Sequence, residues 1–197
     1  NIYSLYEHLK AGMVAAAKED VEITSIGIDT WGVDFAFLGE DGQMLGMPYA
    51  YRDPHTVGAP EEYFEKIVPR KEVYEATGIQ VMNFNSLYQL YAMKRDGSSL
   101  LKAAKEALFI PDALSYMLTG KKVVEYTIAS TSQILNPRTK QFEKSLLEKM
   151  GVDPELFGQI VMPGHVIGHL TDTLAAETGL GKLPVVAVAG HDTASAV

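Results

Sequence analysis

The residues Gly190-His191-Asp192-Thr193 could handle both a proton and a developing negative charge. They follow the apolar run Val185–Ala189, which predicts a buried strand. In open α/β folds, ligands bind at the carboxyl ends of strands, and Gly190 allows the chain to turn sharply there. A carboxylate at that position can accept a proton from a substrate hydroxyl. Asp192 is therefore a candidate general base, and capping of the following helix is the structural alternative.

A second group of candidate site residues lies between Gly27 and Asp34. Asp29 and Asp34 flank Trp31, which is the only tryptophan of the chain. An aromatic plane suits the apolar face of a sugar ring, carboxylates suit its hydroxyls, and Gly32 lets backbone groups approach closely. The segment could bind a sugar, or it could be a strand end and turn with Trp31 in the core.

Three further segments carry polar side chains that could bind a ligand. The Arg52-Asp53 pair lies in a predicted loop, where it could bind a polyol or hold the loop together. Asn85 precedes a predicted helix and could cap it or present amides to a ligand. His165 and His169 are four residues apart, but neighbouring proline and glycines oppose a helix and no third ligand stands out. We therefore predict no metal site.

Composition and missing motifs restrict the classes of function. The 197 residues carry a net charge of −8, which disfavours a nucleic-acid partner. No apolar run approaches the ~20 residues that span a membrane, and no secretory signal is visible. The chain has no cysteine, which excludes a disulfide scaffold and fits a reducing compartment. Walker, GxGxxG and GxSxG motifs are missing, so the chain shows no nucleotide site of its own.

Apolar periodicity predicts alternating helices and short strands, as in an α/β domain. The predicted helices are Ile2–Ala16, Glu61–Val68, Lys71–Thr77, Ser86–Arg95, Leu100–Ala107, Asp112–Leu118, Lys144–Met150 and Pro154–Ile160. The predicted strands are Ile23–Ile28, Val33–Leu38, Lys121–Glu125 and Val185–Ala189, and Met44–Met47 could complete a hairpin through the turn Gly39–Gly42. The chain begins in a helix and stops soon after a strand and turn, so we expect a fragment of a longer protein.

Taken together, several segments resemble the FGGY family of carbohydrate kinases. The matching segments are Ser25–Phe35, Tyr49–Asp53, Thr77–Gln80, Phe84–Leu90, Pro111–Gly120, Glu125–Thr127 and His191–Val197. They occur in family order from about residue 22 to the end of the chain, and His191–Val197 is the strongest single match. The ordered set is much more specific than any one segment.

The resemblance implies an actin-like (ribonuclease H-like) kinase with two domains and a cleft between them. The first domain would bind the sugar and the second most of the ATP. Residues 1–197 would then be the N-terminal sugar-binding domain, lacking the family's first β-hairpin and the C-terminal ATP-binding domain. We therefore expect the isolated chain to be inactive. Its parent would act in the cytoplasm, with ATP, Mg²⁺ and a ketose as the molecules it binds.

The resemblance also assigns roles to individual residues. Asp192 matches the family's catalytic base, and Gly32 matches a glycine that contacts the substrate. His191 and Thr193 match neighbours of the base that touch the sugar. The other expected pocket residues are Trp31, Asp29, Asp53 and Asn85. Residues that contact ATP are not identified by the resemblance.

The form of these motifs favours phosphorylation of L-rhamnulose at its primary hydroxyl, in rhamnose catabolism. L-fuculose or a xylulose is the alternative, because hydrogen bonds in the pocket decide between such ketoses. A non-catalytic sugar-sensing module is an alternative of another class, since actin-like folds also serve as sensors. A glycosidase using Asp29 and Asp192 as paired carboxylates is a third.

Overall fold

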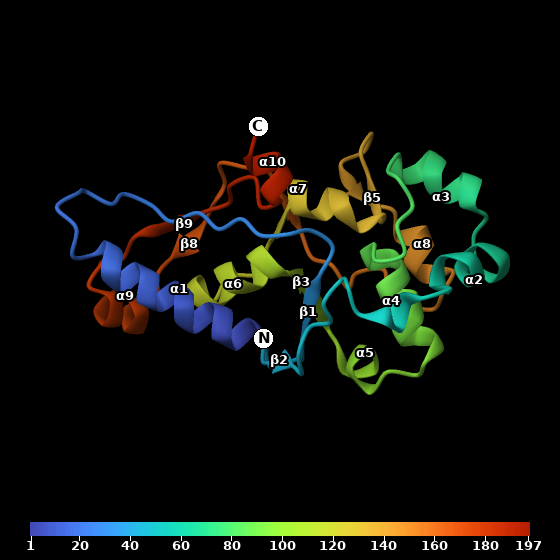
Figure 1. Cartoon of the computed structure of the whole chain (residues 1–197), viewed down its shortest axis with the longest axis horizontal. Coiled ribbons are helices and arrows are strands. Elements are labelled where there is room, and N and C mark those ends of the chain that lie inside the picture. Colours follow the sequence, from blue (N-terminus) through green and yellow to red (C-terminus); the bar gives the residue numbers. More distant parts are fainter.

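The fold was analysed in a computed structural model that describes all 197 residues. Most helices lie toward the two ends of an elongated molecule, whereas α7 (Tyr126–Ala129) and α10 (Asp192–Ser195) lie near its middle (Figure 1). One end holds α1 (Ile2–Ala16), α6 (Ile110–Thr119) and α9 (Asp172–Thr178). The other end holds α2 (Ala59–Lys66), α3 (Arg70–Thr77), α4 (Ser86–Arg95), α5 (Ser99–Ala103) and α8 (Lys144–Glu148). No helix combines the length and apolar character needed to cross a membrane.

A small antiparallel sheet connects the two ends. Its central strand, β1 (Phe35–Leu38), is buried along its whole length. It pairs with β2 (Met44–Leu45) on one side, which confirms the predicted hairpin, and with β3 (Glu106–Phe109) on the other. The predicted helix Leu100–Ala107 is wrong beyond Ala103. Pairing with β1 buries residues 107–109, and this burial outweighs the helix propensity of the alanine-rich segment.

The predicted strand Ile23–Ile28 is wrong as a regular buried strand. The segment runs parallel to residues 184–192 and meets them in isolated bridges at Ile26 and Thr30. These bridges are too widely spaced to form a continuous ladder, and the residues between them are half-buried or exposed. The predicted strand Val185–Ala189 is present in part as β9 (Pro184–Val186), which pairs antiparallel with β8 (Val166–His169).

The predicted helix Pro154–Ile160 is also wrong. After a turn at Pro154, Phe157 forms a parallel bridge with Ala107, and its ring stacks on Phe109 with centroids 5.0 Å apart. Tertiary contact with β3 therefore extends this segment. It continues into β7 (Ile160–Val161), which pairs in parallel with β4. The remaining elements are β4 (Val124–Glu125), η1 (Pro54–Thr56), α7 (Tyr126–Ala129), η2 (Ser130–Ser132), β5 (Leu135–Asn136), β6 (Gln141–Phe142) and α10 (Asp192–Ser195).

The apolar core consists of two clusters of buried side chains. The larger cluster packs the β1–β3 sheet against α2, α4 and α6, and the smaller one lies beneath α1, α9, β8 and β9. Ile28 packs against both clusters. The segment that leads to Trp31 is therefore anchored where the two parts of the core meet.

Candidate active site

A pocket of about 320 Å³ lies where the turn before α10 meets the corner after residue 30. Its lining consists of Trp31, Gly32, Val33, Tyr51, Phe84, Asn85, Thr131, His191 and Asp192. Five of the eight site residues predicted from the sequence are among them. A larger hollow of about 500 Å³ near α4 and α5 contains none of the eight, so we place the candidate site in the smaller pocket.

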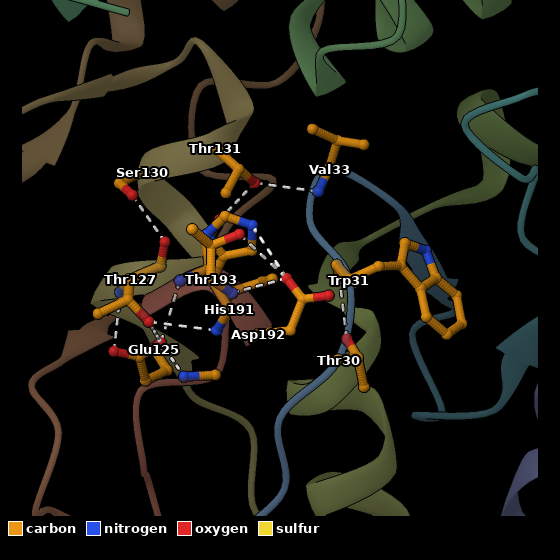
Figure 2. Close-up of polar contacts among 12 residues, drawn as sticks. Thr30, Trp31, Val33, Glu125, Thr127, Ser130, Thr131, His191, Asp192 and Thr193 are labelled. Atoms are coloured by element: carbon orange, nitrogen blue, oxygen red, sulfur yellow. Dashed lines mark hydrogen bonds and ion pairs between the residues drawn. The ribbon is translucent and has the colours of Figure 1, made fainter. Parts of the chain in front are cut away.

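Asp192 is the first residue of α10 and extends an exposed carboxylate from the pocket wall. Its Oδ1 accepts a hydrogen bond from the Thr193 backbone N–H at 2.7 Å, and His191 Nε2 lies 3.4 Å from the same oxygen (Figure 2). The N-cap position of α10 belongs to His191, so Asp192 does not cap this helix in the usual manner. Its carboxylate is free to accept a hydrogen bond from a ligand.

The backbone around Asp192 is paired with the neighbouring segment. Thr30 N–H donates to the Gly190 carbonyl at 2.9 Å, and Asp192 N–H donates to the Thr30 carbonyl at 2.8 Å. This short parallel ladder places Asp192 beside the corner that begins at Trp31. Two strand-end motifs that are about 160 residues apart in the sequence thus form one site.

Val33 turns the corner in a conformation that is costly for its residue type. Its φ of 66° lies in the left-handed region, which a β-branched side chain disfavours. Val33 N–H donates to Thr131 Oγ1 at 3.0 Å, and its carbonyl accepts a bond from Ser86 Oγ at 2.6 Å. A Cβ on Gly32 would come 3.0 Å from the Thr131 side chain, so glycine permits this close approach.

Trp31 is fixed by a buried acid. Its indole Nε1 donates to Asp34 Oδ2 at 2.8 Å, and in Figure 2 the ring points away from Asp192. Asp34 also accepts bonds from the Tyr51 N–H and from Gln89 Nε2, both at 3.1 Å. Burial raises the pKa of the Asp34 carboxyl, while these hydrogen bonds act in the opposite direction. Asp34 therefore fixes the orientation of the Trp31 ring.

Asn85 lies at the floor of the pocket and is almost fully buried. Although it holds the N-cap position of α4, its side chain makes no capping bond. Instead, its Nδ2 donates to Gln133 Oε1 at 2.8 Å and to the Gln80 carbonyl at 3.0 Å. The predicted side-chain cap is thus replaced by contacts that fix the floor.

Three of the predicted site residues do not line the pocket. Asp53 caps η1, where its Oδ1 accepts a bond from the His55 N–H at 2.9 Å. The side chains of Asp29 and Thr193 are exposed, and neither residue is among those that line the pocket. No group of three or more histidine, aspartate or glutamate side chains could hold a metal ion; His165 precedes β8 and His169 ends it, without a third partner.

Sequence reasoning did not find several residues that build this pocket. Tyr51, Phe84 and Thr131 line it, and Ser86 supports its corner from below. Tyr51, Phe84 and Ser86 lie in segments that resemble the family, but no local pattern marked them as pocket residues, and Thr131 lies outside those segments. The positive φ of Val33 also has no sequence signal, since valine normally avoids it.

The pocket offers an exposed carboxylate, an imidazole, an amide-lined floor and an aromatic wall. Such groups suit a ligand with several hydroxyls, one of which could give its proton to Asp192. Comparison with known proteins agrees with this chemistry. Residues 3–197 match the N-terminal domain of the FGGY family of carbohydrate kinases. The chain belongs to this family.

Within the family, proteins named rhamnulokinase are similar to the whole chain. The rhamnulokinase of Bacteroides thetaiotaomicron is 59% identical over all 197 residues, and that of Halalkalibacterium halodurans is 40% identical. The chain spans 40% and 42% of the lengths of these two relatives.

Solved structures of sugar kinases share the fold. A ligand-bound xylulose kinase from Lactobacillus acidophilus superposes with a TM-score of 0.87, over 95% of this chain and 39% of that one, at 19% identity. Plasmodium falciparum glycerol kinase with ADP gives a TM-score of 0.79, over 93% of this chain and 38% of that one, at 15% identity. The predicted actin-like α/β fold of an FGGY first domain is thereby confirmed.

Proposed function

We propose that this chain forms the sugar-binding part of a kinase that phosphorylates L-rhamnulose at its primary hydroxyl. The main support is that Asp192, Gly32 and Trp31 meet in one pocket of a chain that belongs to a carbohydrate kinase family. The choice of L-rhamnulose rests on the whole-chain similarity to proteins named rhamnulokinase. The product would be L-rhamnulose 1-phosphate.

In this proposal, Asp192 acts as the general base. Its carboxylate would accept a hydrogen bond from the primary hydroxyl and take the proton as the oxygen attacks the γ-phosphorus of ATP. The bond from that oxygen to phosphorus forms while the bond to the β-phosphate oxygen breaks, and ADP leaves. Phosphoryl transfer depends mainly on positioning and charge neutralisation, so the fixed backbone around Asp192 suits the task.

We assign most of the ATP site to residues outside this chain. The chain spans about two fifths of its curated relatives and has no glycine-rich phosphate loop, which supports that assignment. Residues 1–197 would then be an N-terminal domain that lacks its first β-hairpin and its C-terminal partner, and would be inactive in isolation. Because ATP would be the donor, we propose the cytoplasm as the compartment.

The side chains present do not fit a protein-held Mg²⁺, because no three acidic or histidine groups converge. We therefore assign no catalytic step to a metal held by this chain. The Mg²⁺ that accompanies ATP in kinases would be bound through phosphate oxygens and water, as this ion prefers.

The experiment is ADP release by the full-length protein with L-rhamnulose, L-fuculose and D-xylulose as acceptors. We expect release with L-rhamnulose, and a loss of ~10² or more in kcat for Asp192→Asn with little change in sugar affinity. Asp20→Asn, on an exposed side chain that does not line the pocket, is the matched control and should keep full activity. Near-normal turnover by Asp192→Asn would remove Asp192 as the base.

The other outcomes separate the alternatives. Release of ADP with a different ketose would keep the mechanism and change the substrate. Binding of L-rhamnulose without any ADP release would favour the sugar-sensing module over the kinase.

A further inference from the structure

Glu125 lies beneath the turn that carries Asp192, and the proposed mechanism does not use it. It ends β4 and is only 2% exposed. Its Oε2 accepts hydrogen bonds from the Gly190 N–H at 3.0 Å, the Ile128 N–H at 3.0 Å and the Thr127 hydroxyl at 2.6 Å. Its Oε1 accepts one from the Thr127 N–H at 2.7 Å. This buried carboxylate thus ties the start of α7 to the turn before α10.

Thr127 extends the connection by one residue. Its hydroxyl donates to Glu125 Oε2 and accepts a hydrogen bond from the His191 N–H at 3.3 Å (Figure 2). Glu125 and Thr127, which we call the Glu125–Thr127 clamp, therefore bind two successive N–H groups of the turn. A Cβ on Gly190 would lie 3.0 Å from Glu125 Oε2, so the backbone passes very close to the clamp.

The turn is held from both sides. The clamp binds the N–H groups of Gly190 and His191, while Thr30 pairs with the Gly190 carbonyl and the Asp192 N–H. The Asp192 carboxylate itself touches only its two neighbours in the chain. Its position relative to a substrate hydroxyl is therefore set by the backbone of the turn.

We infer that Glu125 and Thr127 are positioning residues that fix the catalytic Asp192 for phosphoryl transfer, an inference that rests on the proposed function. Neither side chain lines the pocket, so neither is expected to touch the sugar. General-base catalysis needs the base within hydrogen-bond reach of the reacting hydroxyl, and a displacement of ~1 Å can cost ~10²-fold in rate. Loosening the clamp on one side should therefore lower kcat.

The test compares Thr127→Val, Thr127→Ser and Thr178→Val in the full-length protein. Thr127→Val keeps the shape but removes the hydroxyl bridge, whereas Thr127→Ser keeps the bridge. Thr178→Val is the matched control, since this buried hydroxyl also donates one hydrogen bond, to the Leu174 carbonyl at 2.7 Å, and accepts one from Leu180 N–H. It lies at the end of α9 and touches no part of the turn.

We expect Thr127→Val to lower kcat with L-rhamnulose about ten-fold, with KM for ATP unchanged and Thr127→Ser within about two-fold of wild type. Thr178→Val should lose a similar amount of thermal stability and keep its kcat. Equal kcat values for Thr127→Val and Thr178→Val would overturn the inference. So would a serine variant as slow as the valine variant, because the hydroxyl would then not be the cause.

A second readout does not depend on the reaction. Hydrogen–deuterium exchange of peptides covering residues 189–192 should be faster in Thr127→Val than in wild type, Thr127→Ser and Thr178→Val. Unchanged exchange would show that the clamp does not hold the turn, whatever the kinetics. Absence of ADP release from the wild type, together with faster exchange in Thr127→Val, would overturn the proposed function and the catalytic role, while the physical clamp itself would stand.

Discussion

Asp192 and Trp31 are fixed in the pocket by different means. Asp192 depends on the hydrogen bonds of its backbone, whereas Trp31 is oriented through its own side chain by the buried Asp34. A carboxylate that accepts a proton needs oxygen lone pairs that are not already hydrogen-bonded. A small number of hydrogen-bond donors therefore suits Asp192. An aromatic wall needs a fixed plane, so a strong partner suits Trp31. Under the proposed function, the two arrangements would suit the two kinds of contact that a sugar makes.

Trp31 should report directly on sugar binding, because it is the only tryptophan of the chain and lines the pocket. We expect L-rhamnulose to change its fluorescence emission with a saturable curve whose midpoint lies between about 1 µM and 1 mM, the usual range for enzyme substrates. The physical reason is that a sugar would displace water from the half-buried indole. Titration of the 197-residue chain on a fluorimeter is the measurement.

Free N-acetyltryptophanamide corrects this titration for absorption by the sugar, and Trp31→Phe should lose the signal. A change that grows linearly with sugar concentration, without saturation, would argue against binding beside Trp31.

Sequence reasoning could place Trp31, Gly32, His191 and Asp192 in a candidate site because they lie in short motifs after apolar runs, and the resemblance to the FGGY family favoured a role over the structural alternatives. It could not place Thr131, since a threonine in a short helix has many roles. Only the folded backbone shows that Thr131 holds the corner at Val33. Sequence reasoning thus identified the pocket residues that lie in short local motifs. It missed those that enter the pocket only through contacts between distant segments.

At the scale of elements, long helices were predicted more reliably than short strands. The helix predicted at Ser86–Arg95 matches α4, and the first eight residues of this helix are all buried. The first two residues of β3, Glu106 and Ala107, were predicted as the end of a helix because both have high helix propensity. The conformation of β3 is decided by pairing with β1, a partner about 70 residues away. Strand pairing therefore outweighs the helix propensity of a short segment that joins a sheet.

The segment before Trp31 is sensitive to side-chain volume at Gly27. A Cβ at this position would lie 2.4 Å from Val188 Cγ1, so the segment or its parallel partner must move. We expect Gly27→Ala to lower the free energy of unfolding by about 1–3 kcal/mol through overpacking. Urea denaturation followed by circular dichroism measures the change. Weakened sugar binding should accompany it, because Thr30 in the same segment pairs with the turn at Asp192.

Gly12→Ala is the matched control for this prediction. Gly12 lies inside α1 with no atom within 4 Å of an added Cβ, and its side is exposed. Alanine there should raise the free energy of unfolding by about 0.5–1 kcal/mol, because glycine weakens helix interiors. If both variants change stability in the same direction, steric conflict with Val188 is not the cause.

At the scale of the whole molecule, the most unusual ionisable group is the buried carboxyl of Asp112. Asp112, in the first turn of α6, is fully buried beside β4. Its Oδ1 accepts a hydrogen bond from the Glu125 N–H at 3.1 Å, but its Oδ2 has no partner. Burial raises the pKa of the Asp112 carboxyl well above its usual value, and the nearby Glu125 carboxylate adds to this effect. The folded protein therefore holds this proton more tightly than the unfolded chain.

This difference in proton affinity predicts how stability depends on pH. With a raised folded pKa, the contribution of Asp112 is fully present below the unfolded value of about 3.9 and is lost as the pH rises toward the folded pKa. Asp112→Asn cannot ionise and lacks this loss. The free energy of unfolding of the wild type should therefore fall relative to that of Asp112→Asn, by at most about 1.4 kcal/mol per pH unit between the two pKa values.

Urea unfolding of both proteins at about pH 4.5, 6 and 8 checks this expectation. The difference in unfolding free energy between Asp112→Asn and the wild type should shift in favour of the variant as the pH rises. Asp20→Asn removes a carboxylate from an exposed position and is the control for the loss of one acidic group. A constant difference for Asp112→Asn would mean that water or a structural shift solvates the carboxylate, so that the buried charge does not limit the stability of the fold.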